Sequence, residues 1–258
     1  AVIIGNKHYT RRVPEVDFAH NDADAMQRFV INRLGFRQDN VIDLRDATQA
    51  EMLAVFGNDK TYKGQLWRWV RPRESDVVVF YSGHGVPGLK DGHGYLLPVN
   101  AAPETPESYA YPLALLYANL SKLEARSVTV ILEASFSGDS PSGLLIQGTT
   151  EISVMSKAPV VSKLTVLTAA QGNQVASWDE ETQHGLFTRY LLEALNGAAD
   201  GALYGDGDGK VTANEIKSYL DREMTYAARR QYGREQTVTV VGELNRVMVD
   251  LSAHGVDK

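Results

Sequence analysis

The sequence predicts an α/β domain built on a mostly parallel central sheet. Short apolar runs rich in Val and Ile alternate with amphipathic stretches along the whole chain, the pattern of strands buried on both faces. The chain has 258 residues, of which 43% are apolar, enough for a sizeable core. Because no internal repeat, low-complexity run or clear linker divides it, we expect one domain over residues 1–258.

The expected elements follow one another in a regular order. Apolar runs too short for helices predict five buried strands, at residues 2–5, 41–44, 76–81, 127–132 and 164–168. Between the first two, apolar side chains recur at helical spacing from Phe18 to Leu34, which places Asp22 on the core-facing stripe of a helix that Gly35 ends. Further helices are predicted at 48–56, which opens with capping-box spacing, and at 112–123, 185–195 and 213–230. Residues 85–98 read as a turn or hairpin, and 138–163 as a long surface loop.

Composition excludes several classes of function. Lys and Arg total 26 against 32 Asp and Glu, a net charge of −6 that argues against a nucleic-acid surface. The absence of cysteine removes disulfides, Cys-ligated metals and a cysteine nucleophile. No apolar run is long enough to span a membrane, and no P-loop or dinucleotide glycine motif occurs. The opening Ala1-Val-Ile-Ile-Gly5 lacks an initiator Met, so we expect a processed or excised piece whose cellular location the sequence does not give.

Two motifs follow neighbouring predicted strands. The third strand ends in Phe80-Tyr-Ser-Gly-His-Gly85, and the fourth in Val130-Ile-Leu-Glu-Ala-Ser-Phe-Ser-Gly138. If these strands are adjacent, His84 and Ser135 emerge at the same sheet edge, where α/β proteins place their sites. Ser135 does not lie in the G-x-S-x-G elbow of ordinary serine hydrolases.

These motifs carry a family resemblance. Tyr81-Ser-Gly-His-Gly85 together with Leu132-Glu-Ala-Ser-Phe-Ser-Gly138 resembles the paired His and Cys motifs of the caspase-like cysteine peptidases, especially bacterial caspase-domain proteins and metacaspases. Segments 1–6, 21–26, 167–174 and 184–188 resemble other parts of the family in the same order. The resemblance implies a caspase-like α/β/α sandwich and a cysteine-type endopeptidase domain.

The resemblance also implies a mechanism that this chain does not complete. In the family a Cys thiolate attacks the peptide carbonyl, and His84 and the amides of Gly85 and Ser135 match the positions of its acid-base and oxyanion groups. Ser135 stands at the Cys position, and a hydroxyl is a much poorer nucleophile. We expect an inactive form, either a natural pseudo-peptidase that binds peptides or regulates, or a deliberate replacement of the cysteine; a serine peptidase using Ser135 is a weaker alternative.

Charge predicts the substrate. By resemblance to metacaspases, Asp22, Ser82 and Glu133 line the primary pocket, and two acids in a partly buried pocket favour a Lys or Arg side chain. The alternative is that Asp22 caps its own helix and Glu133 pairs with a nearby base. Animal caspases carry Ser-Trp-Arg where this chain has Ser177-Trp-Asp179, so cleavage after aspartate is not expected; Trp178 is expected beside the pocket, or as a packing residue.

One segment suggests a metal. Residues 204–215 fit an EF-hand loop from its third position onward, with Asp206, Asp208, the carbonyl of Lys210 and Glu215 as calcium ligands. The first position is Tyr204, so the site is weakened unless Asp200 reaches in. The alternative is a turn that caps the last helix, and no cofactor is required for the peptidase chemistry itself.

The expected partner is a protein or peptide with a basic residue at the cleavage point, with neither nucleic acid nor membrane. If basic specificity holds, Lys157 and Lys163 in the long loop are candidates for self-cleavage. The resemblance leaves the oligomeric state open between monomer and dimer.

Overall fold

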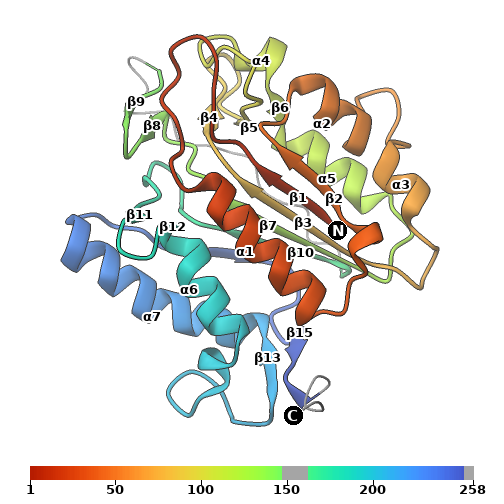
Figure 1. Cartoon of the computed structure of the whole chain (residues 1–258), viewed down its shortest axis with the longest axis vertical. Helices are drawn as coiled ribbons and strands as arrows, with labels where there is room; N and C mark the ends of the chain where they lie inside the picture. The colour runs from red at the N-terminus through yellow and green to blue at the C-terminus, as the bar shows by residue number, and fades with distance from the viewer. Residues whose placement is uncertain (147–161, 253–258) are drawn as a thin grey trace.

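The computed structural model of the chain describes residues 1–146 and 162–252. Its centre is a six-stranded sheet in the order β14-β10-β7-β3-β1-β2 (Figure 1). The strands are β1 (Val2–Gly5), β2 (Ile42–Arg45), β3 (Asp76–Ser82), β7 (Ser127–Glu133), β10 (Leu164–Thr168) and β14 (Thr239–Val241). The first five are parallel, which confirms the five predicted strands to within a residue or so; β14 adds an antiparallel edge.

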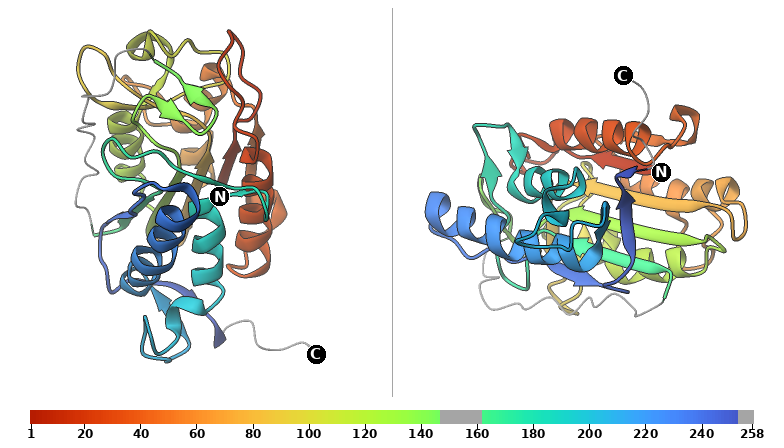
Figure 2. Two further views of the ribbon diagram at one scale, coloured as in Figure 1. Left: turned by 90° about the vertical axis from the view of Figure 1, so that its left-hand side faces the viewer. Right: turned by 90° about the horizontal axis from the view of Figure 1, so that it is seen from below.

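Helices cover both faces of this sheet in three layers (Figure 2). One face carries α1 (Ala19–Asn32), α6 (Leu186–Leu195) and α7 (Ala213–Tyr232), and the other α2 (Gln49–Phe56), α3 (Gln65–Trp69) and α5 (Leu113–Ser121). Successive strand residues point to opposite faces, so Phe80 packs with the first helix group and Tyr81 with the second. The predicted three-layer arrangement is confirmed.

Helix ends follow the sequence signals. Thr48 and Glu51 form the predicted capping box at the start of α2, and Thr212 and Glu215 form another at the start of α7, which ends at the left-handed Gly233. The sequence did not predict α3, a five-residue helix, or the short 3-10 helices Gln38–Asn40 and Ala198–Asp200. Elements this short have little periodicity to detect.

Smaller sheets decorate the core. The predicted hairpin at 85–98 is confirmed as β4 (Gly85–Pro87) and β5 (Gly94–Leu96), which β6 (Tyr111–Pro112) extends after α4 (Pro106–Tyr109). Two further antiparallel pairs are β11 (Trp178–Asp179) with β12 (His184–Gly185), and β13 (Lys210–Thr212) with β15 (Val247–Asp250).

The segment 138–163 begins differently from the expected loop. β8 (Asp139–Ser140) and β9 (Gly143–Leu144) form a short hairpin, and Leu145 and Ile146 after it are buried. Of the two candidate self-cleavage points, Lys157 lies outside the described residues. Lys163 lies just before β10, and its amine donates to the carbonyl of Leu123. Throughout the described part of the chain, no helix combines the length and apolarity needed to cross a bilayer.

Candidate active site

The carboxyl ends of three parallel strands bring the motif residues together. Ser82 at the end of β3 pairs in register with Glu133 at the end of β7 and with Gly5 of β1. His84 and Ser135 each lie two residues beyond this pair, and the N–H of Gly83 donates to the carbonyl of Glu133 at 3.3 Å. The expectation that the two residues emerge at the same sheet edge is therefore confirmed.

His84 is held by the loop between β1 and α1. Its imidazole is 4% exposed, and Nε2 lies 2.7 Å from the carbonyl oxygen of Pro14. Because a carbonyl only accepts, Nε2 carries the proton and Nδ1 is the free base in the neutral ring. Burial lowers the pKa of His84 to about 4, so the ring is neutral near pH 7.

Tyr9, which the sequence did not single out, supports this histidine. Its hydroxyl accepts the backbone N–H of His84 at 2.8 Å, and its ring packs on the imidazole with centroids 4.7 Å apart. A side chain at Gly83 would lie 2.7 Å from the same hydroxyl, so this glycine is needed for close approach. Tyr9 lies in an irregular segment, where spacing gives no signal.

Gly85 lies directly against the nucleophile position. A Cβ at Gly85 would approach the carbonyl oxygen of Ser135 and the ring of Phe136 to 2.5 Å each, which only glycine avoids. The hydroxyl of Ser135 donates to the carbonyl of Asp139 at 3.4 Å. Within the described ranges, no hydrogen bond joins the His84 imidazole to Ser135, so the hydroxyl is not paired with its base.

The three residues predicted to line a pocket do come together. Asp22 of α1 is 1% exposed, and it accepts from the hydroxyl of Ser82 at 3.0 Å. It also accepts from the N–H of Gly185 at 3.0 Å and lies 2.9 Å from Nδ1 of His184. The β11–β12 hairpin, with His184 as a member that sequence reasoning missed, therefore completes the group.

Glu133 is the second buried acid of this group. One carboxylate oxygen, Oε2, accepts the N–H and the hydroxyl of Thr188 at 2.6 and 2.8 Å, while Oε1 is buried without a partner. Burial, and then the charge of Asp22, raise the pKa of Glu133 to about 8. Burial also raises the pKa of Asp22, against its hydrogen bonds and the charge of His184.

The two carboxylates differ in their hydrogen bonds. Asp22 receives several donors whereas Glu133 lacks one on Oε1, so the contacts stabilise the charged form of Asp22 more than that of Glu133. The alternatives for the two acids are wrong. The carboxylate of Asp22 makes no cap to its own helix, and Glu133 forms no ion pair among the described residues.

The two candidates on β11 differ. Trp178 pairs in register with Gly185, whose N–H contacts Asp22, and its ring meets that of Phe18 with centroids 5.9 Å apart. This places Trp178 beside the buried acids. Asp179 forms an ion pair with Arg189 of α6 and accepts from the hydroxyl of Thr182 at 2.9 Å, so its charge is already balanced by a neighbouring helix.

The EF-hand-like loop is partly assembled. Carboxylate oxygens of Asp200, Asp206 and Asp208 lie within 4.8 Å of one another, so Asp200 does reach in where Tyr204 offers no ligand. Glu215 instead holds the cap of α7, as the alternative expected: it accepts the N–H of Thr212 at 2.7 Å and of Asp206 at 3.2 Å. Lys210, whose carbonyl was the other expected ligand, begins β13. Calcium binding here stays a prediction.

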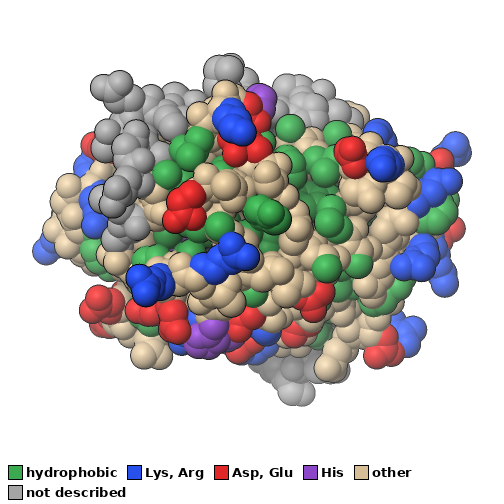
Figure 3. All heavy atoms as spheres, turned by 90° about the horizontal axis from the view of Figure 1, so that it is seen from above, with side chains coloured by type: hydrophobic (Ala, Val, Ile, Leu, Met, Phe, Trp, Pro, Cys, Tyr) green, Lys and Arg blue, Asp and Glu red, His purple; other side chains and the backbone are tan. Residues whose placement is uncertain are grey.

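The surface around the strand ends is varied. Figure 3 shows the end of the molecule at the top of Figure 1, with apolar side chains toward the middle of the face and many charged ones along its rim. Leu89 and Tyr109, from the β4–β5 turn and α4 at this end, are 43% and 51% exposed.

A cavity of about 360 Å³ lies at the opposite ends of the strands, beside Asp76 and Ser127, and includes none of the candidate site residues.

Comparison with known proteins identifies the family. A family profile described as the caspase domain matches residues 1–239. The chain belongs to the caspase family. It is thus a caspase-like peptidase domain, and the resemblance seen in its motifs is confirmed.

Two relatives show how far the likeness extends. Metacaspase-9 of Arabidopsis thaliana is 29% identical over 98 residues, which are 37% of this chain and 30% of that protein. The crystal structure of caspase-1 from Spodoptera frugiperda aligns with a TM-score of 0.59 at 13% identity, over 96% of this chain and 87% of that one. The latter supports the shared fold, and the former covers only a minor part of the relative's length.

Proposed function

We propose that this caspase-like domain recognises peptides through an Arg or Lys side chain and, with serine at position 135, holds them without cutting. The observation that carries the recognition is the buried, unpartnered Oε1 of Glu133 beside the carboxyl group of Asp22. A guanidinium or ammonium group supplies the missing donor and a balancing charge. An acidic side chain would instead add a third carboxylate to this group.

The cation would enter at the expense of existing contacts. His184, whose side chain is 23% exposed, is the accessible member of the group and donates to Asp22. An incoming cation competes with it for that carboxylate. Binding of a positive charge also favours loss of the proton from Glu133, because the opposite charge offsets the burial that holds its pKa high.

The reaction edge, formed by His84, Gly85 and Ser135, supports the proposed lack of cleavage. An imidazole whose pKa is about 4 is a weak base, and a serine hydroxyl is far less acidic than a thiol; Ser135 is also not hydrogen-bonded to this imidazole within the described residues. In a Ser135→Cys form, the thiol loses its proton to Nδ1 of His84 and the thiolate attacks the peptide carbonyl. The amides of Gly85 and residue 135 hold the oxyanion. The imidazolium then protonates the leaving amine, and water hydrolyses the thioester.

The test compares the unmodified chain, Ser135→Cys, and Ser135→Cys with His84→Ala on Arg-, Lys- and Asp-terminated reporter peptides. We expect cleavage only by Ser135→Cys, only after Arg or Lys, and its loss with His84→Ala. Cleavage after Asp would refute the proposed specificity. Activity of the unmodified chain that disappears in Ser135→Ala would establish a serine peptidase, and no activity from a folded Ser135→Cys would leave a peptide-binding module.

A further inference from the structure

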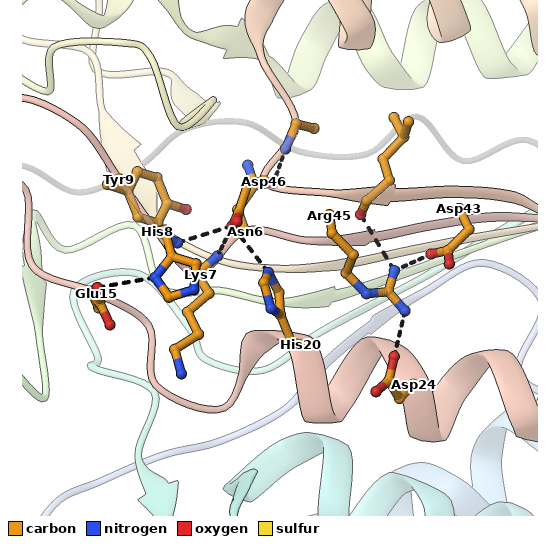
Figure 4. Close-up of polar contacts among 12 residues, drawn as sticks. Asn6, Lys7, His8, Tyr9, Glu15, His20, Asp24, Asp43, Arg45 and Asp46 are labelled. Atoms are coloured by element: carbon orange, nitrogen blue, oxygen red, sulfur yellow. Dashed lines mark hydrogen bonds and ion pairs between the residues drawn. The ribbon is translucent and has the colours of Figure 1, made fainter.

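Two histidines and an aspartate from three separate segments meet near the reaction edge (Figure 4). His8 lies in the loop after β1, His20 in the first turn of α1, and Asp46 directly after β2. Ligand atoms of the three side chains all lie within 4.8 Å of one another. The proposed peptide chemistry uses none of them.

Asp46 is fixed in its orientation before any ligand binds. Its backbone has the left-handed φ of 58°, and Oδ1 accepts the N–H groups of Lys7 and His8 at 2.8 and 2.9 Å. These two donors hold the carboxylate in place beside the two histidines.

The two imidazoles are also oriented. Nδ1 of His8 lies 3.0 Å from the carboxylate of Glu15, an acceptor that leaves Nε2 with its lone pair free. A carboxylate behind a histidine ring is the arrangement that fixes metal-binding histidines. Nε2 of His20 lies 3.1 Å from Oδ1 of Asp46, and the two rings stand edge to face with centroids 5.4 Å apart.

We propose that His8, His20 and Asp46 form a binding site for a zinc-like divalent cation. Two imidazoles and one carboxylate are donors that zinc accepts, with a water in the fourth position. Two ligands of a tetrahedral zinc are about 3.3 Å apart, close to the 3.1 Å between His20 and Asp46. The side chains of His8, His20 and Asp46 are 54%, 29% and 27% exposed, so the cation can enter from solvent.

The location gives the cation an effect on the reaction edge. The loop that carries His8 also carries Tyr9 and Pro14, which contact the backbone and the imidazole of His84. A cation that joins this loop to α1 and to the end of β2 restrains it against His84. A bound cation would therefore restrain Tyr9 and Pro14, the two residues that hold His84 in place.

Cobalt(II) is a suitable probe, because a four-coordinate site gives it strong visible absorption. We would titrate the unmodified chain with Co²⁺ and then displace the metal with Zn²⁺. One saturating equivalent is expected. His8→Ala and His20→Gln should weaken binding at least about tenfold, and Glu15→Gln, behind His8, about tenfold.

Two variants serve as matched controls. His93→Ala removes a histidine, and Asp43→Asn removes a carboxylate of β2 near Asp46; neither belongs to the cluster. Both should bind Co²⁺ as the unmodified chain does, and thermal unfolding with chelator present should confirm that every variant folds. Absence of a saturable absorption, or an absorption that survives both His8→Ala and His20→Gln, would overturn the proposal. Because no peptide is involved, failure here leaves the proposed peptide function untouched.

Discussion

The reaction edge and the buried acidic group of Asp22 and Glu133 both lie at the carboxyl ends of β3 and β7, but they differ in how their hydrogen bonds are satisfied. At the reaction edge, His84 is neutral and bonded to a carbonyl, and Ser135 donates to its own turn. In the buried acidic group, Asp22 of α1 lies beside Glu133 at the end of β7, and Oε1 of Glu133 has no donor. Under the proposed function, recognition and reaction depend on different side chains, so each can be removed without the other.

The largest effect should come from restoring sulfur. Ser135→Cys is expected to raise kcat/KM on an Arg reporter by about 10³-fold or more, since removal of a catalytic nucleophile typically costs at least that much. Initial rates at peptide concentrations well below KM would give this ratio. An increase of less than tenfold in a folded protein would mean that the reaction edge has lost more than its nucleophile.

Gly85→Ala should impair cleavage without altering the contacts of Asp22 and Glu133. The new Cβ would lie 2.5 Å from the carbonyl of Ser135, so the strand ends must separate. In the Ser135→Cys form, we expect kcat to fall by about 10²-fold, and overpacking to cost about 1–3 kcal/mol of stability. Gly201→Ala, with its nearest contact at 3.4 Å, is the control. Equal effects of the two changes would contradict this role of Gly85.

Asp22→Asn should weaken the preference for a basic side chain without altering the contacts of His84 and Ser135. In the Ser135→Cys form, we expect the preference for Arg over an uncharged reporter to fall about tenfold or more, because the ionised partner of the cation is removed. Asp17→Asn, an exposed carboxylate just before the same helix, should leave the preference unchanged. A preference that survives Asp22→Asn would place basic recognition elsewhere.

The two regions should change the free energy of unfolding with pH in opposite directions. The folded pKa of Glu133 is raised to about 8 from 4.5, so its stabilising contribution is complete below the lower value and is lost as pH rises to 8. The pKa of His84 is lowered from 6.5 to about 4, so its contribution is present above 6.5 and is lost as pH falls through 4.

The measurement is urea unfolding at pH 7 and 8, where folded His84 is neutral; its residual titration in the unfolded state is the same in both proteins compared. Glu133→Gln should lose less stability over this interval than the unmodified chain, by up to about 1.4 kcal/mol. Comparing the two proteins cancels the amino terminus of Ala1, whose pKa burial lowers to about 5. An unchanged pH slope in Glu133→Gln would show that Glu133 is not the proton carrier.

The smallest expected effect concerns calcium, at a distance from both regions. Calcium should raise the melting temperature by a few degrees through Asp200, Asp206 and Asp208. Asp208→Asn should remove the shift, whereas Asp59→Asn, outside the loop, should retain it. A shift common to both variants would indicate a general ionic effect rather than a site.

Features whose signal lies within one stretch of sequence could be predicted from the sequence. Buried parallel strands carry continuous apolar runs, so the sheet and the common edge for His84 and Ser135 were predictable. The capping box of Thr48 and Glu51 is likewise a local pattern, and it was predicted. The antiparallel β14 has three residues of intermediate burial, and nothing in such a segment distinguishes it from a loop.

Contacts between distant segments were not predictable. His184 meets Asp22 across 162 residues of sequence, and Tyr9 meets His84 across 75. The cluster of His8, His20 and Asp46 joins three segments in the same way. No spacing rule relates such residues, because the register of the sheet and the packing of α1 bring them together. By contrast, Asp206 and Asp208, which are predicted to bind calcium, lie two residues apart, so a local sequence pattern singled them out.

Binding of a basic peptide without cleavage can be measured on the unmodified chain itself. The chain is incubated with a labelled Arg-containing peptide, binding is measured by fluorescence anisotropy, and the recovered peptide is then analysed by mass spectrometry. We expect saturable binding that Asp22→Asn weakens, intact peptide after prolonged incubation, and cleavage at the Arg when Ser135→Cys is used instead. Cleaved peptide from the unmodified chain, or no binding by either form, would contradict it.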